Sequence, residues 1–139
     1  MIEGLSHVTF VCRDIERMGE ILTGVLGARE VYASGEASHS VAPEKFFLAG
    51  DVWIAVVEGE SLAARTYNHV AFKVRDEDLD GCLDRIRALG LDVKPPRPRV
   101  AGEGRSIYFH DDDNHLFELH TGTLAERLEA YATLAEAGR

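Results

Sequence analysis

The alternation of apolar and polar residues repeats along the chain. Residues 7–14 (HVTFVCRD) and 69–76 (HVAFKVRD) are identical at five of eight positions, at an offset of 62 residues. Each segment is an apolar-rich run that ends in Arg-Asp, which predicts a β-strand leading into the start of a helix. A repeat of this kind indicates two similar structural units within one chain.

A helical pattern follows each of the two predicted strands. Between residues 15 and 26, apolar side chains recur on one helical face, with Asp14 as the predicted N-cap and Gly27 as the stop. Residues 79–89 repeat the pattern, and Gly90 closes this second helix. The two units therefore begin alike, with a strand and an amphipathic helix.

Three shorter strand candidates follow each of these helices. They are residues 30–32, 45–48 and 52–58 in the first half, and residues 92–94, 106–110 and 116–120 in the second. Each half is therefore predicted to form a βαβββ module, and the predicted fold class is α+β with paired βαβββ modules. Neither module can bury a full core by itself, so modules must pair within one chain or between two chains.

These patterns predict a single domain over residues 1–139. Module one spans about residues 1–60, module two about residues 66–121, and a C-terminal helix about residues 123–135. This helix begins with a capping box, Thr123-Leu-Ala-Glu126. Residues 34–43 have the weakest pattern and are expected to form a loop.

The composition excludes several classes of protein. Of the 139 residues, 45% are hydrophobic and 28% are charged, so the chain can bury a core and is not expected to be disordered. The net charge of −9 disfavours binding to nucleic acid or to anionic membranes, and we expect neither as a partner. No apolar run approaches the ~20 residues of a membrane span.

The N-terminus and the cysteines bear on the cellular compartment. Residues 1–5 have neither a basic start nor an apolar h-region, so no signal peptide is expected. Cys12 and Cys82 lie outside any CxxC motif and are expected to be free, buried thiols. The sequence therefore predicts a protein of the reducing cytoplasm.

The repeat duplicates a histidine. His7 and His69 occupy equivalent positions, and if the two strands lie side by side across a pseudo-two-fold axis, both imidazoles can point into one cavity. Glu118 lies on the last predicted strand, between apolar neighbours. Two imidazoles and a carboxylate suit Mn, Fe, Co, Ni or Zn and leave open coordination positions. His7, His69 and Glu118 are therefore the candidate metal ligands.

Other interpretations compete with this ligand set. Each histidine could simply satisfy a hydrogen bond within a sheet. His115 follows the turn 111–114 and is expected to support it, whereas His120 could be a ligand or could orient one. The acidic residues 111–113 lack the spaced ligands and distal glutamate of an EF-hand, so we do not expect a calcium site there.

A second constellation lies in residues 102–109 (GEGRSIYF). The two glycines let the backbone approach a ligand closely, and Ser106 and Tyr108 share a strand face and offer hydroxyl groups. Four cations lie nearby in this acidic chain: Lys94, Arg97, Arg99 and Arg105. They could bind a small anion such as a phosphonate, phosphate or carboxylate, or could be solvated charges that balance Glu103 and residues 111–113.

The ordered combination of these motifs resembles the vicinal oxygen chelate superfamily, which includes glyoxalase I, extradiol dioxygenases, bleomycin-binding proteins and fosfomycin-resistance proteins. Residues 111–120 (DDDNHLFELH) are similar to its DPDGH…E element, with Asp in place of Pro and Asn in place of Gly. The segments that resemble the fosfomycin-resistance branch are residues 4–9, 67–72 and 102–109. Those that resemble its FosX subgroup are residues 46–53, 95–99 and 118–122.

This resemblance covers nearly the whole chain, and it implies a homodimer of paired βαβββ modules with each metal site built from strands of both chains. It implies Mn(II) as the metal on His7, His69 and Glu118. It also implies fosfomycin, a small phosphonate epoxide, as the substrate. The positions that surround bound fosfomycin in the family correspond to Thr9, Trp53, Lys94, Ser106, Tyr108 and Arg127.

The resemblance also changes the interpretation of Glu44. A carboxylate just before a strand is by itself most simply a surface residue, but the FosX subgroup has its general base at this position. The implied activity is Mn(II)-dependent hydration of the fosfomycin epoxide to an inactive diol, which confers antibiotic resistance. The alternatives are a transferase that opens the ring with glutathione or another cellular thiol, another enzyme of the superfamily, and a non-catalytic drug-binding protein.

Overall fold

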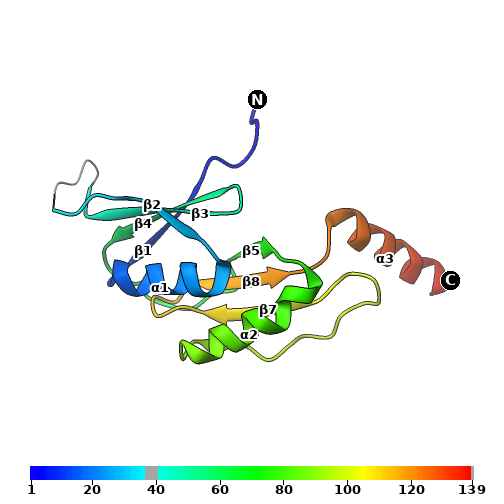
Figure 1. Ribbon diagram of the computed structural model, residues 1–139. Helices are drawn as coiled ribbons and strands as arrows, with labels where there is room; N and C mark the ends of the chain where they lie inside the picture. Colours follow the sequence, from blue (N-terminus) through cyan, green and yellow to red (C-terminus); the bar gives the residue numbers. More distant parts are fainter. Residues whose placement is uncertain (37–40, 139) are drawn as a thin grey trace.

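The chain folds into two four-stranded sheets covered by helices, as seen in a computed structural model that describes residues 1–36 and 41–138 (Figure 1). The first half contains β1 (Val8–Cys12), α1 (Ile15–Leu26), β2 (Arg29–Ala33), β3 (Glu44–Ala49) and β4 (Val52–Glu58). The second half contains β5 (His69–Lys73), the short 3-10 helix η1 (Asp76–Asp78), α2 (Leu79–Ala88), β6 (Asp92–Val93), β7 (Ser106–His110) and β8 (Leu116–His120), followed by α3 (Leu124–Ala137). Of the loop expected over residues 34–43, residues 37–40 lie outside the described residues.

The two sheets have the same topology, which confirms the predicted α+β class and the paired βαβββ modules. Their strand orders are β1-β4-β3-β2 and β5-β8-β7-β6. In each sheet the first strand of the module runs parallel to the last, and the remaining neighbours are antiparallel. The sequence repeat therefore corresponds to a structural repeat.

The predicted helix signals are present at the observed helix ends. Asp14 caps α1, because its carboxylate accepts a hydrogen bond from the backbone N–H of Arg17 at 3.0 Å. Gly27 ends α1 with φ of 65°, a left-handed conformation that glycine adopts without strain. Thr123 and Glu126 form the predicted capping box at the start of α3.

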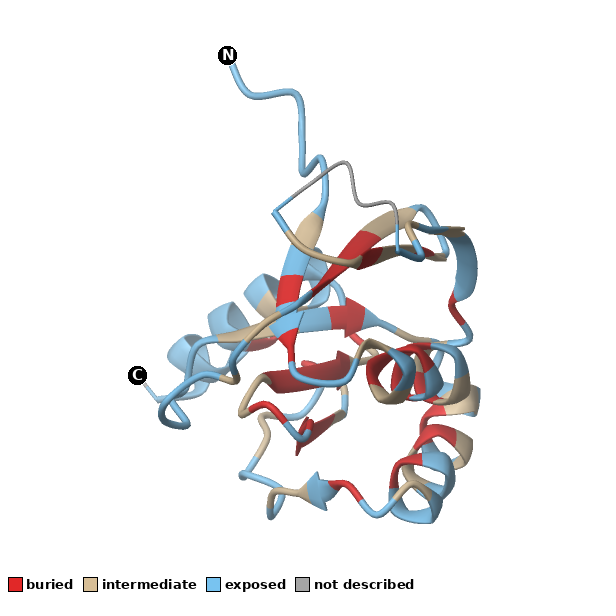
Figure 2. Ribbon diagram, turned by 90° about the vertical axis from the view of Figure 1, so that its left-hand side faces the viewer, coloured by how far each residue is buried: buried red, intermediate tan, exposed pale blue. Residues whose placement is uncertain are grey.

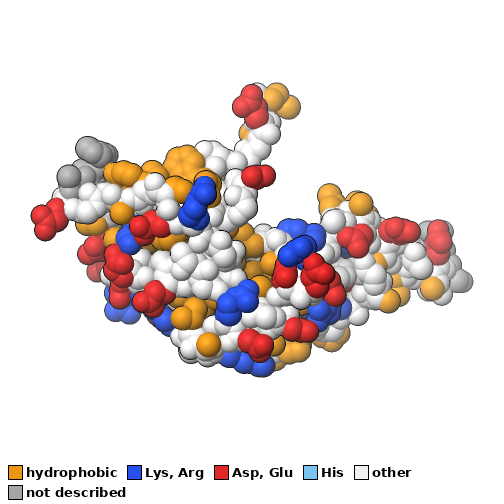
Figure 3. Space-filling model, viewed as in Figure 1, with side chains coloured by type: hydrophobic (Ala, Val, Ile, Leu, Met, Phe, Trp, Pro, Cys, Tyr) orange, Lys and Arg blue, Asp and Glu red, His pale blue; other side chains and the backbone are white. Residues whose placement is uncertain are grey.

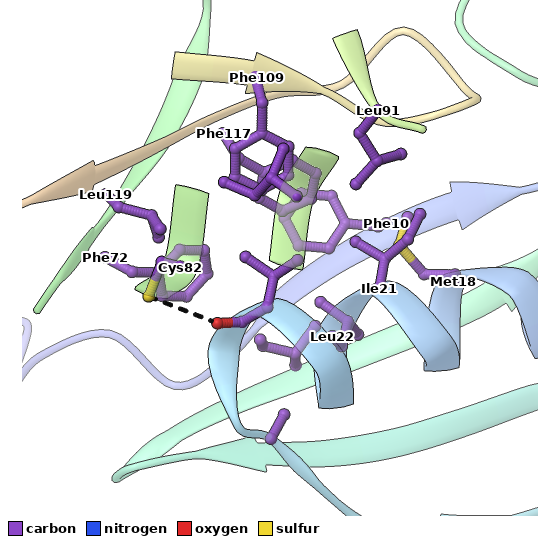
Figure 4. Close-up of a cluster of buried hydrophobic side chains, with 14 of the residues drawn as sticks. Phe10, Met18, Ile21, Leu22, Phe72, Cys82, Leu91, Phe109, Phe117 and Leu119 are labelled. Carbon is purple, nitrogen blue, oxygen red and sulfur yellow. Dashed lines mark hydrogen bonds between the residues drawn. The ribbon is translucent and has the colours of Figure 1, made fainter. Parts of the chain in front are cut away.

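One hydrophobic core joins the two halves of the chain (Figures 2 and 4). The ring centroids of Phe10, from β1, and Phe117, from β8, are 5.0 Å apart, and Phe109 stacks on Phe117 at 5.2 Å. Cys12 and Cys82 are free and buried in this core, as expected. Because side chains alternate along a strand, the face of each sheet opposite the core presents a different set of residues.

The C-terminal helix α3 extends away from the two sheets (Figure 1). Its apolar side chains are exposed at the helical spacing of Leu124, Leu128, Tyr131 and Leu134, and hydrophobic atoms are visible along it in Figure 3. This apolar stripe therefore does not pack against its own chain. Within the described part of the chain, no helix combines the length and apolarity needed to cross a membrane.

Candidate functional site

The outer face of the second sheet gathers polar residues from three strands. In the antiparallel β7–β8 pair, Tyr108 lies opposite Glu118 and Ser106 lies opposite His120. In the parallel β5–β8 pair, Ala71 is the neighbour of Glu118, and His69 lies two residues before Ala71. Directly opposed residues share a face, so these side chains lie together on the side away from the core.

His69 and Glu118 form the centre of this group. His69 Nε2 lies 3.0 Å from Glu118 Oε1, while His69 Nδ1 lies 2.7 Å from the backbone oxygen of Tyr67. A carbonyl oxygen only accepts hydrogen bonds, so Nδ1 carries the proton of the neutral ring. The lone pair of Nε2 then points at the carboxylate. This is the arrangement of a metal-binding histidine whose other nitrogen is held by a backbone carbonyl.

The Glu118 carboxylate is buried, yet it is favoured in the ionised form. Burial by itself raises the pKa of Glu118, but hydrogen bonds from Ser106 and Tyr108 and the nearby charge of Arg99 outweigh burial and lower the pKa overall. The ionised carboxylate oxygen and the imidazole lone pair lie 3.0 Å apart. Two electron-rich groups this close repel each other unless a cation or a proton lies between them. Imidazole nitrogen and carboxylate oxygen are suitable ligands for Mn(II), so this pair fits the implied metal.

The second oxygen of Glu118 has different partners. Ser106 Oγ donates to Oε2 at 2.5 Å, and Arg99 Nη2 lies 3.5 Å from the same atom. The Arg99 guanidinium also donates to Glu103 at 3.0 Å and to the Tyr108 hydroxyl at 3.3 Å. Glu103 is completely buried, so it holds the positive charge of Arg99 beside Glu118.

The outer face of the first sheet carries the other candidate residues. Thr9 is paired with Ala55, and Trp53 lies two residues before Ala55 on the same face. The His7 ring lies 4.2 Å from the Trp53 ring. Glu44 begins β3 opposite Val57 and shares this face.

Glu44 is buried, contrary to the simplest expectation from the sequence alone. Among the described residues no side chain donates a hydrogen bond to its carboxylate. A buried carboxylate to which no described side chain donates is available to a water molecule or a ligand.

The structure does not bring His7 and His69 together within one chain. β1 pairs with β4 and β5 pairs with β8, and the two sheets turn their apolar faces toward the common core. His7 contacts Trp53 of the first sheet, whereas His69 contacts Glu118 of the second. In residues 1–36 and 41–138 of the single chain, no three His, Cys, Asp or Glu side chains are placed to hold a metal ion. One chain thus presents two half-sites: the first half-site holds His7, Thr9, Glu44 and Trp53, and the second holds His69, Ser106, Tyr108 and Glu118.

Lys94 and Arg127 lie at the edge of the second half-site. Lys94 Nζ is 5.4 Å from the centre of the Tyr67 ring, and the Tyr67 hydroxyl is 3.4 Å from that of Tyr108. Arg127 Nη2 lies 3.3 Å from Nε2 of His120. Both cations therefore connect to the group through other side chains, Lys94 through Tyr67 and Arg127 through His120.

The turn before β8 is built as the sequence predicted. His115 Nδ1 bonds to the Asp111 carboxylate at 2.7 Å, so His115 supports the turn. Asn114 has φ of 68°, a left-handed conformation in which asparagine is the usual substitute for glycine. The exchange of Gly for Asn in the DPDGH-like element is therefore compatible with the turn.

Gly104 places the loop before β7 against the residues that follow β8. A Cβ atom at position 104 would lie 2.7 Å from the backbone nitrogen of Gly122, and φ of Gly104 is +92°. We expect Gly104→Ala to destabilise the protein by about 1–3 kcal/mol, because the side chain meets backbone and the conformation is strained. Urea unfolding measures this loss. Gly4→Ala, where nothing lies within 4 Å, is the control and should change stability by less than about 0.5 kcal/mol.

Comparison with known proteins agrees with this architecture. Residues 4–119 match the Glyoxalase/Bleomycin resistance protein/Dioxygenase superfamily. The chain belongs to this superfamily. Its two βαβββ modules and its pair of half-sites are therefore features of a glyoxalase-superfamily protein.

Within the superfamily the chain is of the FosX type. It is 63% identical over 139 residues, the full length of both chains, to the fosfomycin resistance protein FosX of Mesorhizobium japonicum. The metallothiol transferase FosB of Shouchella clausii is more distant, at 32% identity over 141 residues, covering 97% of this chain and 91% of that protein.

A solved structure of the FosX type matches the whole fold. It is a crystal structure of a mutant FosX from Listeria monocytogenes, complexed with Mn(II) and 1S,2S-dihydroxypropylphosphonic acid. The two chains are 52% identical, the match covers 94% of this chain and 99% of that one, and the TM-score is 0.86. That FosX protein binds Mn(II), the cofactor that fits His69 and Glu118 here.

His120 was expected to be a ligand or to orient one, and the structure places it on the face of Glu118, opposite Ser106. The contact of Glu103 with Arg99 was not predicted from the sequence. Glu103 gave a weaker signal, as one acidic residue between two glycines. The cations near residues 102–109 have different partners. Arg99 reaches Glu118, whereas Arg105 pairs with Asp76 and Asp80 at the surface.

Proposed function

We propose that this FosX-type protein is an Mn(II)-dependent hydrolase that adds water to the epoxide ring of fosfomycin and gives an inactive diol. The observation that carries the proposal is the full-length identity of 63% to FosX, joined to the FosX structure that holds Mn(II) and 1S,2S-dihydroxypropylphosphonic acid. That compound is the diol expected from hydration of fosfomycin. The protein would thereby confer resistance to the antibiotic.

The metal is proposed to bind at a site made by two protomers of a homodimer. His69 and Glu118 supply one part, and His7 of the partner subunit supplies the third ligand. Two features support this: the half-sites lie on separate outer faces of one chain, and α3 exposes an apolar stripe that a second copy could cover. When bound, Mn(II) supplies Lewis-acid chemistry at the epoxide oxygen.

The substrate is proposed to lie between the two half-sites. The proposed contacts come from the first sheet (Thr9 and Trp53) and from the second sheet and its surroundings (Lys94, Ser106, Tyr108 and Arg127). Two cations and two hydroxyl groups on one side suit the phosphonate, which is an anion rich in acceptor oxygens. The indole ring of Trp53 offers an apolar wall to the carbon skeleton of the small epoxide.

Glu44 is proposed as the general base. Its carboxylate accepts a proton from water as the water oxygen bonds to an epoxide carbon and the C–O bond of the ring breaks. The ring oxygen becomes an alkoxide and gains a proton from solvent to become the second hydroxyl of the diol, and Glu44 returns its proton to solvent. The burial of Glu44 and the absence of a donor to its carboxylate among the described residues support this role.

A thiol transferase is the second candidate, because the FosB relative named above is a metallothiol transferase. The metal chemistry is the same, and only the nucleophile differs. The twofold higher identity to FosX, together with Glu44, favours water as the nucleophile.

We also propose a cytoplasmic location, in keeping with the free thiols of Cys12 and Cys82.

Phosphorus NMR of fosfomycin incubated with the purified protein tests the proposal. With Mn(II) and without thiol, we expect many equivalents of diol per protomer, and we expect a chelator to stop the reaction. Binding that ends at one equivalent without a new product would indicate a drug-binding protein. Conversion that requires glutathione or another thiol would instead establish the transferase.

A further inference from the structure

A chain of three hydrogen bonds connects α3 to the proposed metal ligand. Arg127 Nη2 lies 3.3 Å from Nε2 of His120, Nδ1 of His120 lies 2.6 Å from Oγ of Ser106, and Ser106 Oγ lies 2.5 Å from Oε2 of Glu118. The last three residues share the outer face of the second sheet. Nothing in the proposed reaction assigns a role to His120.

The chemistry of the four groups orients every proton in this chain. An ionised carboxylate only accepts, so the single hydroxyl proton of Ser106 goes to Glu118. Ser106 then has only lone pairs for His120, and Nδ1 must carry the proton of the ring. A guanidinium only donates, so Arg127 donates to the lone pair of Nε2. The hydrogen bonds therefore all run in one direction, from Arg127 to Glu118.

The His120 ring lies in a close-packed, largely buried position. A Cβ atom at residue 122 would lie 2.8 Å from Nε2 of His120 and 2.5 Å from the backbone oxygen of Glu103. Glycine at position 122 therefore leaves room for the ring, which lies close against the backbone of this residue. The side chain of His120 is 12% exposed, so water has little access to its two hydrogen bonds.

We infer that His120 is a positioning residue for the metal site: it fixes the hydroxyl of Ser106, and Ser106 in turn fixes the carboxylate of Glu118. This inference rests on the proposed function, in which Glu118 binds Mn(II). Oε2 is held by Ser106, which leaves Oε1 facing Nε2 of His69. In this structure Ser106 therefore donates its proton to the proposed metal ligand. Removing a residue that orients a metal ligand weakens metal affinity by about 10- to 100-fold.

Two substitutions of His120 separate the roles of its two nitrogens. His120→Asn can place an amide N–H where Nδ1 lies and can still donate to Ser106. His120→Gln reaches the position of Nε2 and loses the bond to Ser106. We expect the Gln variant to bind Mn(II) about 10- to 100-fold more weakly, and the Asn variant to stay within about threefold of the parent. Titration of Mn(II) followed by electron paramagnetic resonance measures both affinities without substrate.

A double-mutant cycle tests whether His120 acts through Ser106. In a Ser106→Ala background, we expect His120→Gln to cause no further loss of Mn(II) affinity, because the intermediate group is already gone. Additive losses would overturn the inference, since they would mean that His120 affects the metal by another route. Equal affinities of the Gln variant and the parent would overturn it as well.

His115→Gln is the matched control. Like His120, His115 is a largely buried histidine, with a side chain that is 11% exposed. Its Nδ1 bonds to the Asp111 carboxylate, in the turn before β8. We expect it to lower the melting temperature and leave Mn(II) affinity unchanged.

Glu118→Ala separates the two proposals. If it leaves Mn(II) affinity intact, the proposed metal site is wrong; if it abolishes binding while His120→Gln has no effect, only the role of His120 is wrong.

Discussion

Glu44→Gln is expected to lower kcat for fosfomycin hydration by about 10²–10⁴-fold, the range that a general base contributes. The amide has the size of the carboxylate but cannot take a proton from water. Binding of Mn(II) and fosfomycin should remain, because Glu44 is not among the proposed metal ligands. The rate of diol formation by phosphorus NMR, together with Mn(II) affinity, checks both parts of this expectation.

Glu58→Gln provides the control for this change. Glu58 ends β4 in the same sheet, is exposed, and undergoes the same change in charge and shape. We expect its kcat to match that of the parent protein. A Glu44→Gln protein that hydrates fosfomycin at the parent rate would show that another group accepts the proton.

Local features of the fold could be predicted because they depend on neighbouring residues. The caps at Asp14, Gly27 and Thr123 act within one helical turn, so the sequence pattern is sufficient to place them. The similarity of residues 7–14 and 69–76 predicted equivalent strands. The alternation of side chains along a strand placed Ser106 and Tyr108 on one face.

Features that depend on distant segments could not be predicted in the same way. The pairing of Arg99 with Glu103 and Glu118 requires a loop and a strand to meet, and no spacing rule reports that contact. The burial of Glu44 depends on how its strand is covered in three dimensions. The orientation of the two sheets depends on their packing about a common core, and the structure shows that His7 and His69 lie on different sheets of one chain.

That orientation leads to the second prediction with a large effect, which concerns pairs of inactive variants. His7→Ala and Glu118→Ala are each expected to abolish detectable hydration, because each removes a proposed Mn(II) ligand from both sites of a homodimer. Co-expression of the two variants with different tags yields a mixed dimer. In that dimer one site lacks both ligands, while the other has intact His7 from one subunit and intact His69 and Glu118 from its partner.

We therefore expect the co-expressed mixture to recover about a quarter of the parent activity, since half of randomly formed dimers are mixed and each has one complete site. Purification through both tags should raise the value to about half. His69→Ala with Glu118→Ala is the control pair. Both residues belong to the same half-site, 3.0 Å apart, so every site in their mixed dimer lacks a ligand and no activity returns.

The two pairs together test the assembly of the site and not only the identity of its ligands. Recovery by the first pair and none by the second can arise only if His7 works with the His69 and Glu118 of another chain. If one chain supplied all three ligands, neither pair would recover, and the sheets would have to rearrange for His7 to reach Glu118. Recovery by both pairs would mean that His69 and Glu118 act in different sites, which is incompatible with their contact in a single chain.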